Sequence, residues 1–177
     1  MTKVVAAGDP TPLGGTFLTF SPPAQNQAGD VAFSAVIRGG DAEQGVFLFS
    51  GGQLTTVAEF SAASPLKEHT PYAIVPALNA NQDVAFPGLL PETGKDTPGI
   101  FRSTPSGIET LAADEHPSAA GPRLSIDVED TSPLAFNNAG SIALNTVVKD
   151  GEDILGIFVV SQTGLLEKSV GIGDPTP

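Results

Sequence analysis

The chain has 177 residues, of which 20 are acidic and eight are basic, so its formal net charge is −12 at pH 7. This balance argues against a nucleic-acid partner, because a phosphate backbone is bound through clustered Lys and Arg. With no cysteine in the chain, disulfides and thiolate metal sites are excluded. No run of about 18 apolar residues is present, so we expect no insertion into a membrane.

The N-terminal residues do not contain the apolar core of a signal peptide. The pattern described next begins at once, so we expect the chain to be a piece of a longer protein. The first expected element is an extra strand over residues 2–7, which precedes the sequence Gly8-Asp9-Pro10.

A short pattern then recurs three times, at residues 26–33, 79–86 and 137–144. Each copy is followed, in the same order, by a Gly-Val-Phe or Gly-Ile-Phe triplet and by a glycine turn. Consecutive copies lie about 53 to 58 residues apart, a spacing that indicates a repeat architecture. We therefore expect one repeat domain over residues 1–177, with three units at about 8–60, 61–115 and 116–173.

Each unit is expected to form four strands, because Gly and Pro interrupt almost every window long enough for a helix. In chain order, the expected strands are 16–21, 30–37, 46–49 and 53–59; 72–77, 83–90, 100–102 and 108–112; and 134–136, 141–148, 157–160 and 165–170.

The second and third strands of a unit carry apolar residues on both faces, as Val31 and Phe33 against Ala32 show. Such strands lie between packed layers, whereas the fourth strand is more polar. This gradient is typical of a propeller blade, so we predict an all-β fold of three four-stranded propeller-type blades. The alternative is a β-trefoil, which also has three units of four strands but whose barrel strands should alternate more strictly.

Three blades are fewer than the about four to eight of a propeller, so we expect self-association through the open blade faces. A head-to-tail dimer with six blades is favoured over a trimer with nine. The extra strand at 2–7 is expected to pair with a strand of a neighbouring subunit, where it would latch the ring.

Two sets of residues should hold the units together. The repeated phenylalanines are expected to be buried between blades, and they are Phe33, Phe47, Phe86, Phe101 and Phe158. Asn26, Asn79 and Asn137 should hold the turn before each second strand through side-chain hydrogen bonds to the backbone.

Candidates for chemistry are few. A hydrolase would need His69 or His116 beside a carboxylate and a nucleophile, which could be Ser64 or Ser118. No nucleophile motif surrounds either histidine, so solvated loop histidines are the favoured interpretation. Asp127, Glu129 and Asp130 could supply oxygen ligands to calcium. They match no EF-hand loop, so a solvated acidic loop is favoured and no cofactor is expected.

The repeats resemble the bacterial NxxGxxAF tandem-repeat proteins, with a weaker likeness to TolB-type propeller repeats. The matching residues are Asn26, Gly29, Val31, Ala32 and Phe33; Gly45, Val46 and Phe47; Gly52, Leu54, Val57 and Ala58; and Gly8-Asp9-Pro10 with Gly173-Asp174-Pro175. The sequence departs from the pattern at Gln82, where glycine is expected, and at Leu144, where phenylalanine is expected. The resemblance covers the whole chain and implies a secreted or surface-anchored protein without established chemistry.

We therefore predict a non-enzymatic structural or binding module, located outside the cell or at its surface. One alternative is a hydrolase or lyase acting on the top face of the ring. Another is a carbohydrate-binding module with Tyr72, the only tyrosine, as its aromatic platform.

Overall fold

The computed structural model describes residues 3–66, 74–92, 95–104, 106–113, 123–125, 134–150 and 152–171. These residues form an all-β fold of 14 strands and contain no helix. The strands form three antiparallel sheets, each built from one expected unit of the sequence.

The first sheet has the order β1-β3-β4-β5, with β2 paired to β3 beside β1. Its strands are β1 (Thr16–Phe20), β2 (Ala24–Gln25), β3 (Val31–Arg38), β4 (Gln44–Ser50) and β5 (Gln53–Phe60).

The other two sheets repeat this order along the chain. The second sheet is β6-β7-β8-β9, and the third is β10-β12-β13-β14 with β11 paired to β12. Their strands are β6 (Ala77–Leu78), β7 (Val84–Glu92), β8 (Lys95–Thr104), β9 (Gly107–Ala113), β10 (Arg123–Ser125), β11 (Ala135–Phe136), β12 (Ile142–Asp150), β13 (Glu152–Val160) and β14 (Leu166–Gly171).

The first strand of a unit differs from the expectation of one short strand. In the first sheet it is split into β1 and β2, which pair with opposite ends of β3. Pro22 and Pro23 separate the two pieces, because proline has no N–H to donate to the ladder. In the third sheet the expected strand at 134–136 is only the second piece, and β10 was not predicted.

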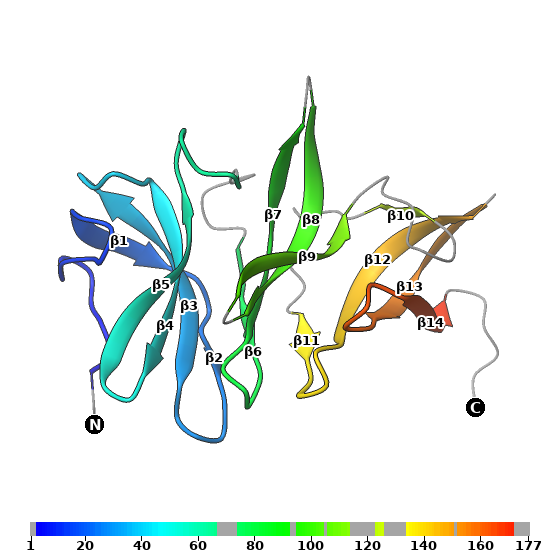
Figure 1. The fold of residues 1–177 in the computed structure, drawn as a ribbon, viewed down its shortest axis with the longest axis horizontal. Helices are drawn as coiled ribbons and strands as arrows, with labels where there is room; N and C mark the ends of the chain where they lie inside the picture. Colours follow the sequence, from blue (N-terminus) through cyan, green and yellow to red (C-terminus); the bar gives the residue numbers. More distant parts are fainter. Residues whose placement is uncertain are drawn as a thin grey trace.

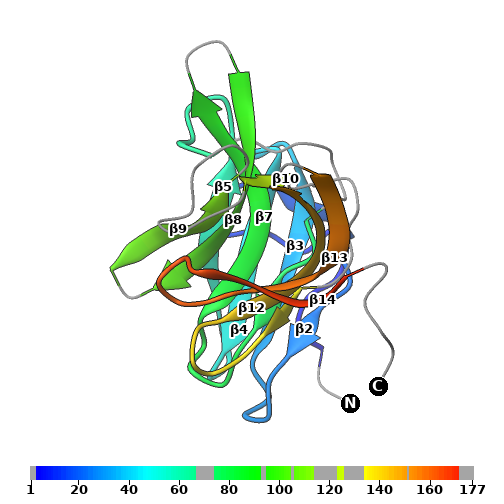
Figure 2. The same cartoon turned by 90° about the vertical axis from the view of Figure 1, so that its right-hand side faces the viewer.

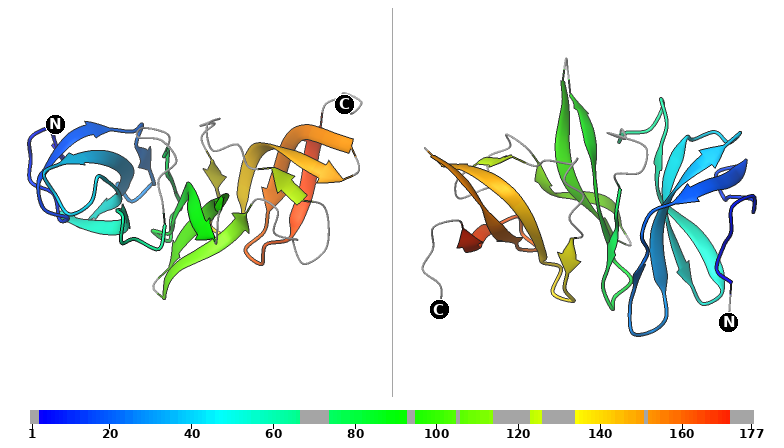
Figure 3. Two further views of the ribbon diagram at one scale, coloured as in Figure 1. Left: turned by 90° about the horizontal axis from the view of Figure 1, so that it is seen from above. Right: turned by 180° about the vertical axis from the view of Figure 1, so that it is seen from behind.

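The three sheets stack face to face in chain order, so the first and third lie at opposite ends of the row (Figures 1 and 3). One apolar cluster joins the first and second sheets, including Ala32 and Val46 against Phe86 and Phe101. A second cluster joins the second and third sheets, including Ile100 against Phe158. Neighbouring sheets therefore hold each other through side-chain packing.

No strand of one sheet pairs with a strand of another within the described part of the chain. A β-trefoil would need one closed barrel shared by all three units, and these strands do not form one. The propeller prediction is confirmed only as far as three antiparallel sheets, because the described strands close no ring.

A third apolar cluster covers the outer face of the first sheet. It contains Phe17, Phe33 and Phe47, with Val4 and Val5 of the N-terminal segment packed against them. Residues 3–7 form no strand in this chain, which differs from the expected strand at 2–7. Pairing of this segment with a second chain stays a prediction.

All five repeated phenylalanines are buried, as predicted. Phe86, Phe101 and Phe158 lie between sheets. Phe33 and Phe47 lie instead on the outer face of the first sheet, where they pack against other residues of that sheet, such as Phe17 and Leu54, and against the N-terminal segment.

Candidate assembly interface

The three asparagine turns have one geometry. Asn26 Oδ1 accepts a hydrogen bond from the Asp30 backbone N–H at 3.0 Å, and Asn79 Oδ1 accepts one from Asp83 N–H at 3.0 Å. Asn137 Oδ1 accepts from Ser141 N–H at 2.9 Å. The predicted role of these asparagines in holding their turns is therefore confirmed.

The same asparagines also connect one sheet to the next. Asn26 Nδ2 donates to the Asn79 carbonyl at 3.1 Å, and Asn79 Nδ2 donates to the Asn137 carbonyl at 3.3 Å. These bonds form a directional ladder that runs from the first sheet to the third. Sequence reasoning did not find it, because the bond between turns exists only once the sheets are stacked.

The ladder ends with an unused group on each side. In the described structure Asn137 Nδ2 donates to no acceptor, whereas Asn79 Nδ2 also reaches the Asp83 carboxylate at 2.9 Å. At the other end, the Asn26 carbonyl accepts only from Gly29 N–H at 3.1 Å. The chain therefore presents a free donor beside the third sheet and spare acceptor capacity beside the first.

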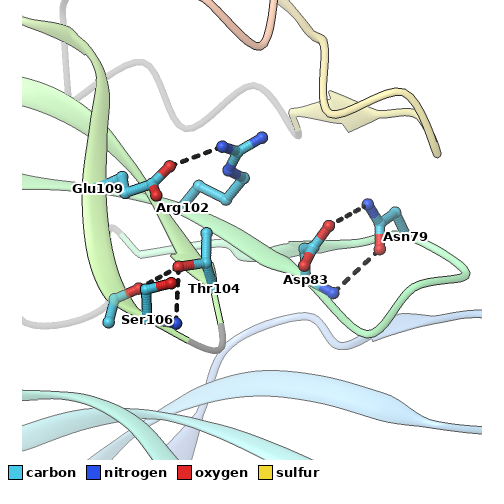
Figure 4. A network of polar contacts seen from close by, with 7 residues as sticks. Asn79, Asp83, Arg102, Thr104, Ser106 and Glu109 are labelled. Carbon is cyan, nitrogen blue, oxygen red and sulfur yellow. Dashed lines mark hydrogen bonds and ion pairs between the residues drawn. The ribbon is translucent and has the colours of Figure 1, made fainter.

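Two carboxylates reinforce the first two turns. Asp30 is buried, and hydrogen bonds from the side chains of Ser50, Asn26 and Gln82 hold the pKa of Asp30 below its usual value. Asp83 accepts from Asn79 in the same way, as Figure 4 shows. The third turn has Ser141 at the corresponding position.

Gln82 departs from the repeat pattern at a position that requires a left-handed backbone. Its φ is 68°, where the corresponding Gly29 and Gly140 have 89° and 78°. A residue with a Cβ is strained there. The Gln82 side chain of the second sheet also lies near the Asp30 carboxylate of the first and helps to lower the pKa of Asp30.

The two sheet interfaces differ beside these turns. In the first, Leu48 lines an open pocket of about 220 Å³ together with Asn81, Gln82, Asp83, Ser103 and Thr104. In the second, Arg102 stands at the place of Leu48, and its guanidinium lies directly against Gly140. Arg102 Nη2 forms an ion pair with Glu109 Oε2 at 2.6 Å (Figure 4). At the second interface, the long side chain of Arg102 thus occupies the space that stays open beside Leu48 at the first interface.

The third sheet exposes the face that is covered on the other two. Ile157 and Val170 are adjacent across β13 and β14, and each is 46% exposed. The corresponding pair in the first sheet, Val46 and Ala58, is buried against the second sheet. Figure 2 views the molecule from this end, with β12, β13 and β14 nearest the reader. We call the surface formed by Ala143, Leu155, Ile157, Val159 and Val170 the open face of the third sheet.

The candidates for chemistry lie mostly outside the described residues. Asp127, Glu129 and Asp130, as well as His69, His116 and Tyr72, fall in the gaps at 67–73, 114–122 and 126–133. The calcium and sugar-platform hypotheses therefore stay predictions. The described residues contain no group of three or more His, Asp or Glu placed to hold a metal.

Ser64, one of the two serines considered as a nucleophile, lies within the described residues. Its contacts show a different role. Its hydroxyl donates to the Glu59 carbonyl at 2.7 Å and accepts from Leu66 N–H at 3.1 Å. The side chain is buried and both of its contacts are to backbone, so Ser64 holds the turn that follows β5.

One family model matches residues 1–177, that is, the whole chain. The chain belongs to DUF7453, a family of unknown function. No curated protein matches this DUF7453 chain. In the described part of the chain, no helix is long and apolar enough to cross a membrane. The resemblance to NxxGxxAF and TolB-type repeats is not tested by the family match and stays a prediction.

Proposed function

We propose that this DUF7453 chain is a non-enzymatic structural module of the β-propeller type, which completes a ring by binding further copies of itself. Its three sheets act as blades, and the ring is a dimer with six blades or, less favourably, a trimer with nine. From the resemblance given above, we place this scaffold outside the bacterial cell or at its surface.

The open face of the third sheet carries the proposal. The same positions bury Val46 and Ala58 in the first sheet and Ile100 and Ala112 in the second. Each of those faces is covered by the next sheet along the chain. A face built like the two covered ones, yet exposing Ile157, is suited to receive one more sheet of the same kind.

The asparagine ladder supports the same conclusion. Each turn donates from its side chain to the following turn, and Asn137 has the donor without the following turn. A further sheet that brings an Asn26-type carbonyl beside Asn137 would extend the ladder by one bond. The apolar open face and the asparagine ladder therefore both require a second copy to bind in the head-to-tail orientation.

Light scattering coupled to size-exclusion chromatography tests this proposal across a series of protein concentrations. The expected result is a dimer, or a trimer, that dissociates on dilution. Ile157→Asp should give a monomer at every concentration, because a buried unpaired carboxylate is strongly unfavourable. Ile108→Asp is the matched control: Ile108 is 42% exposed on β9 of the second sheet, which lies at neither end of the row, and its replacement should leave association unchanged.

A monomer for the unmodified chain at all concentrations would contradict the proposed function. Equal association of the Ile157→Asp variant would show that copies meet through another surface.

A further inference from the structure

The outer face of the first sheet has the composition of one side of an interface between two sheets. Phe33 and Phe47 stand where the second sheet has Phe86 and Phe101. Leu13 stands where the second unit has Leu66, since both precede their asparagine by the same distance in sequence. In the second sheet these side chains face the first sheet, which supplies Ala32, Val46 and Ala58. Among the described residues, no sheet packs on this outer face of the first sheet to supply such side chains.

The N-terminal segment covers part of this outer face, at the place where another sheet packs on the second sheet. Val5 precedes Asp9 of the first Gly-Asp-Pro sequence by four residues, as Val170 precedes Asp174 of the last. Val170 in turn corresponds to Ala58, because each is paired with the residue after the glycine of the Gly-Val-Phe or Gly-Ile-Phe triplet. Val5 packs on the outer face, and by its distance from the Gly-Asp-Pro sequence it corresponds to a fourth-strand residue of a unit.

Asp9 holds this segment in position. Its carboxylate accepts from Ala6 N–H at 2.8 Å and forms an ion pair with Lys3 Nζ at 2.9 Å. These contacts, the bond from Lys3 first, lower the pKa of Asp9. The backbone then joins the first sheet, where Phe17 N–H donates to the Asp9 carbonyl at 3.0 Å. The segment is thus tied to the sheet at its C-terminal end.

We infer that residues 3–7 are an intramolecular cap that occupies the docking place for the third sheet of a second copy, and that assembly requires the cap to leave. The inference rests on the proposed function. In the capped chain Val5 covers the first sheet. In the assembled state Val170 of the neighbouring copy takes that place, while Ile157 and Val159 cover the part of the face that the short cap does not reach.

The two states exclude each other, since Val5 and Val170 correspond to one position in the stack. Only chains whose cap is displaced can associate. The apparent association constant between copies is therefore the intrinsic constant multiplied by the fraction of chains in which the cap is displaced. It also shields Phe33 and Phe47 from water in the separate chain. This arrangement differs from a latch, which would strengthen assembly.

Removal of residues 1–7 gives the first test. The shortened chain should associate at least about tenfold more tightly than the full chain, as measured by light scattering or analytical ultracentrifugation. Ile157→Asp should abolish association in both backgrounds. Circular dichroism and thermal melting must show that the shortened chain is folded.

Labelling of a single cysteine gives a second test in the full-length chain. The native chain has no cysteine, so Val5→Cys carries the only thiol. At low concentration the capped segment should react slowly with a maleimide, and the rate should rise with protein concentration as copies displace the cap. The same variant with Ile157→Asp should react slowly at every concentration.

The outcomes separate this inference from the proposed function. If the shortened and full-length chains associate equally, or if the shortened chain associates more weakly, the inference of a cap is wrong while the ring proposal stands. Labelling that slows as copies assemble would likewise overturn the cap. If neither chain associates, the ring proposal itself fails.

Discussion

At the scale of single residues, Gln44 is a polar side chain placed in an apolar interface. It is 1% exposed, and neither its Nε2 nor its Oε1 has a hydrogen-bond partner. Gln44 lies on the face of β4 that carries Val46, toward the second sheet. An unpaired buried polar group costs about 1–3 kcal/mol, so this residue lowers the stability of the packing.

We predict that Gln44→Met raises the free energy of unfolding by about 1–2 kcal/mol, because the unpaired amide is replaced by an apolar group of similar length. Gln53→Met, at an exposed position of β5, is the control and should change stability by less than about 0.5 kcal/mol. Urea denaturation measures both. A loss of stability in Gln44→Met would show that the amide has a partner in solution.

Asp30 makes the first turn sensitive to acid. Hydrogen bonds from Ser50, Asn26 and Gln82 hold its pKa below the ordinary value of 3.8. The carboxylate therefore contributes stability that is fully present above this ordinary value and is lost as pH falls through the lower pKa of the folded state.

Asp30→Asn should accordingly lower stability near neutral pH and reduce the further loss on acidification to about pH 3. Chemical denaturation of both proteins at the two pH values is the measurement. An acid-induced loss that is equal in both proteins would show that other groups are responsible.

At the scale of elements, the sequence allowed the second, third and fourth strands of every unit to be predicted, although β8 and β13 begin five residues before the expected strands at 100–102 and 157–160. Their apolar runs and glycine turns are local signals, as residues 30–37 against β3 show. The split of the first strand was missed, although Pro22 and Pro23 are a visible signal for it. The inter-turn bond of Asn26 and the orphaned Gln44 could not be predicted, because both depend on how separate sheets meet.

A bulge at one place in each sheet is a further feature that the repeat pattern did not reveal. The register between third and fourth strands shifts after Val46, Ile100 and Ile157, always beside the phenylalanine of the triplet. A bulge of this kind increases the twist of a sheet. Its recurrence gives all three sheets a similar twist, which lets their faces stack in one row.

The packing between sheets should depend on the buried phenylalanine rings at each interface. Phe86 is fully buried between the first and second sheets, in contact with Phe60 and Phe101. Phe86→Ala should reduce the free energy of unfolding by about 3–5 kcal/mol, since it leaves a cavity. Phe20→Ala, at a ring that is 37% exposed on β1, is the control and should cost clearly less. Equal losses in thermal melting would contradict the assignment of Phe86 to the interface.

At the scale of the whole molecule, the fold has two unequal ends. The first sheet ends in a face of phenylalanines under the N-terminal segment, and the third ends in the open face, where Asn145 and Glu167 lie beside the aliphatic side chains. Unequal ends favour head-to-tail contacts over symmetric ones, and such contacts close a ring when the rotation per subunit allows it. The direction of the asparagine ladder enforces the same polarity.

Charge opposes this assembly. Each copy has a formal net charge of −12, so two copies repel each other at long range while their contact surfaces are apolar. The Debye length falls from about 30 Å at about 0.01 M salt to about 10 Å at about 0.1 M, which removes most of the repulsion.

We therefore predict that association strengthens as sodium chloride is added. Sedimentation at several salt concentrations measures this effect, with Ile157→Asp as the control that stays monomeric throughout. Dissociation of the unmodified chain by salt would mean that ion pairs, rather than the open face of the third sheet, hold the copies together.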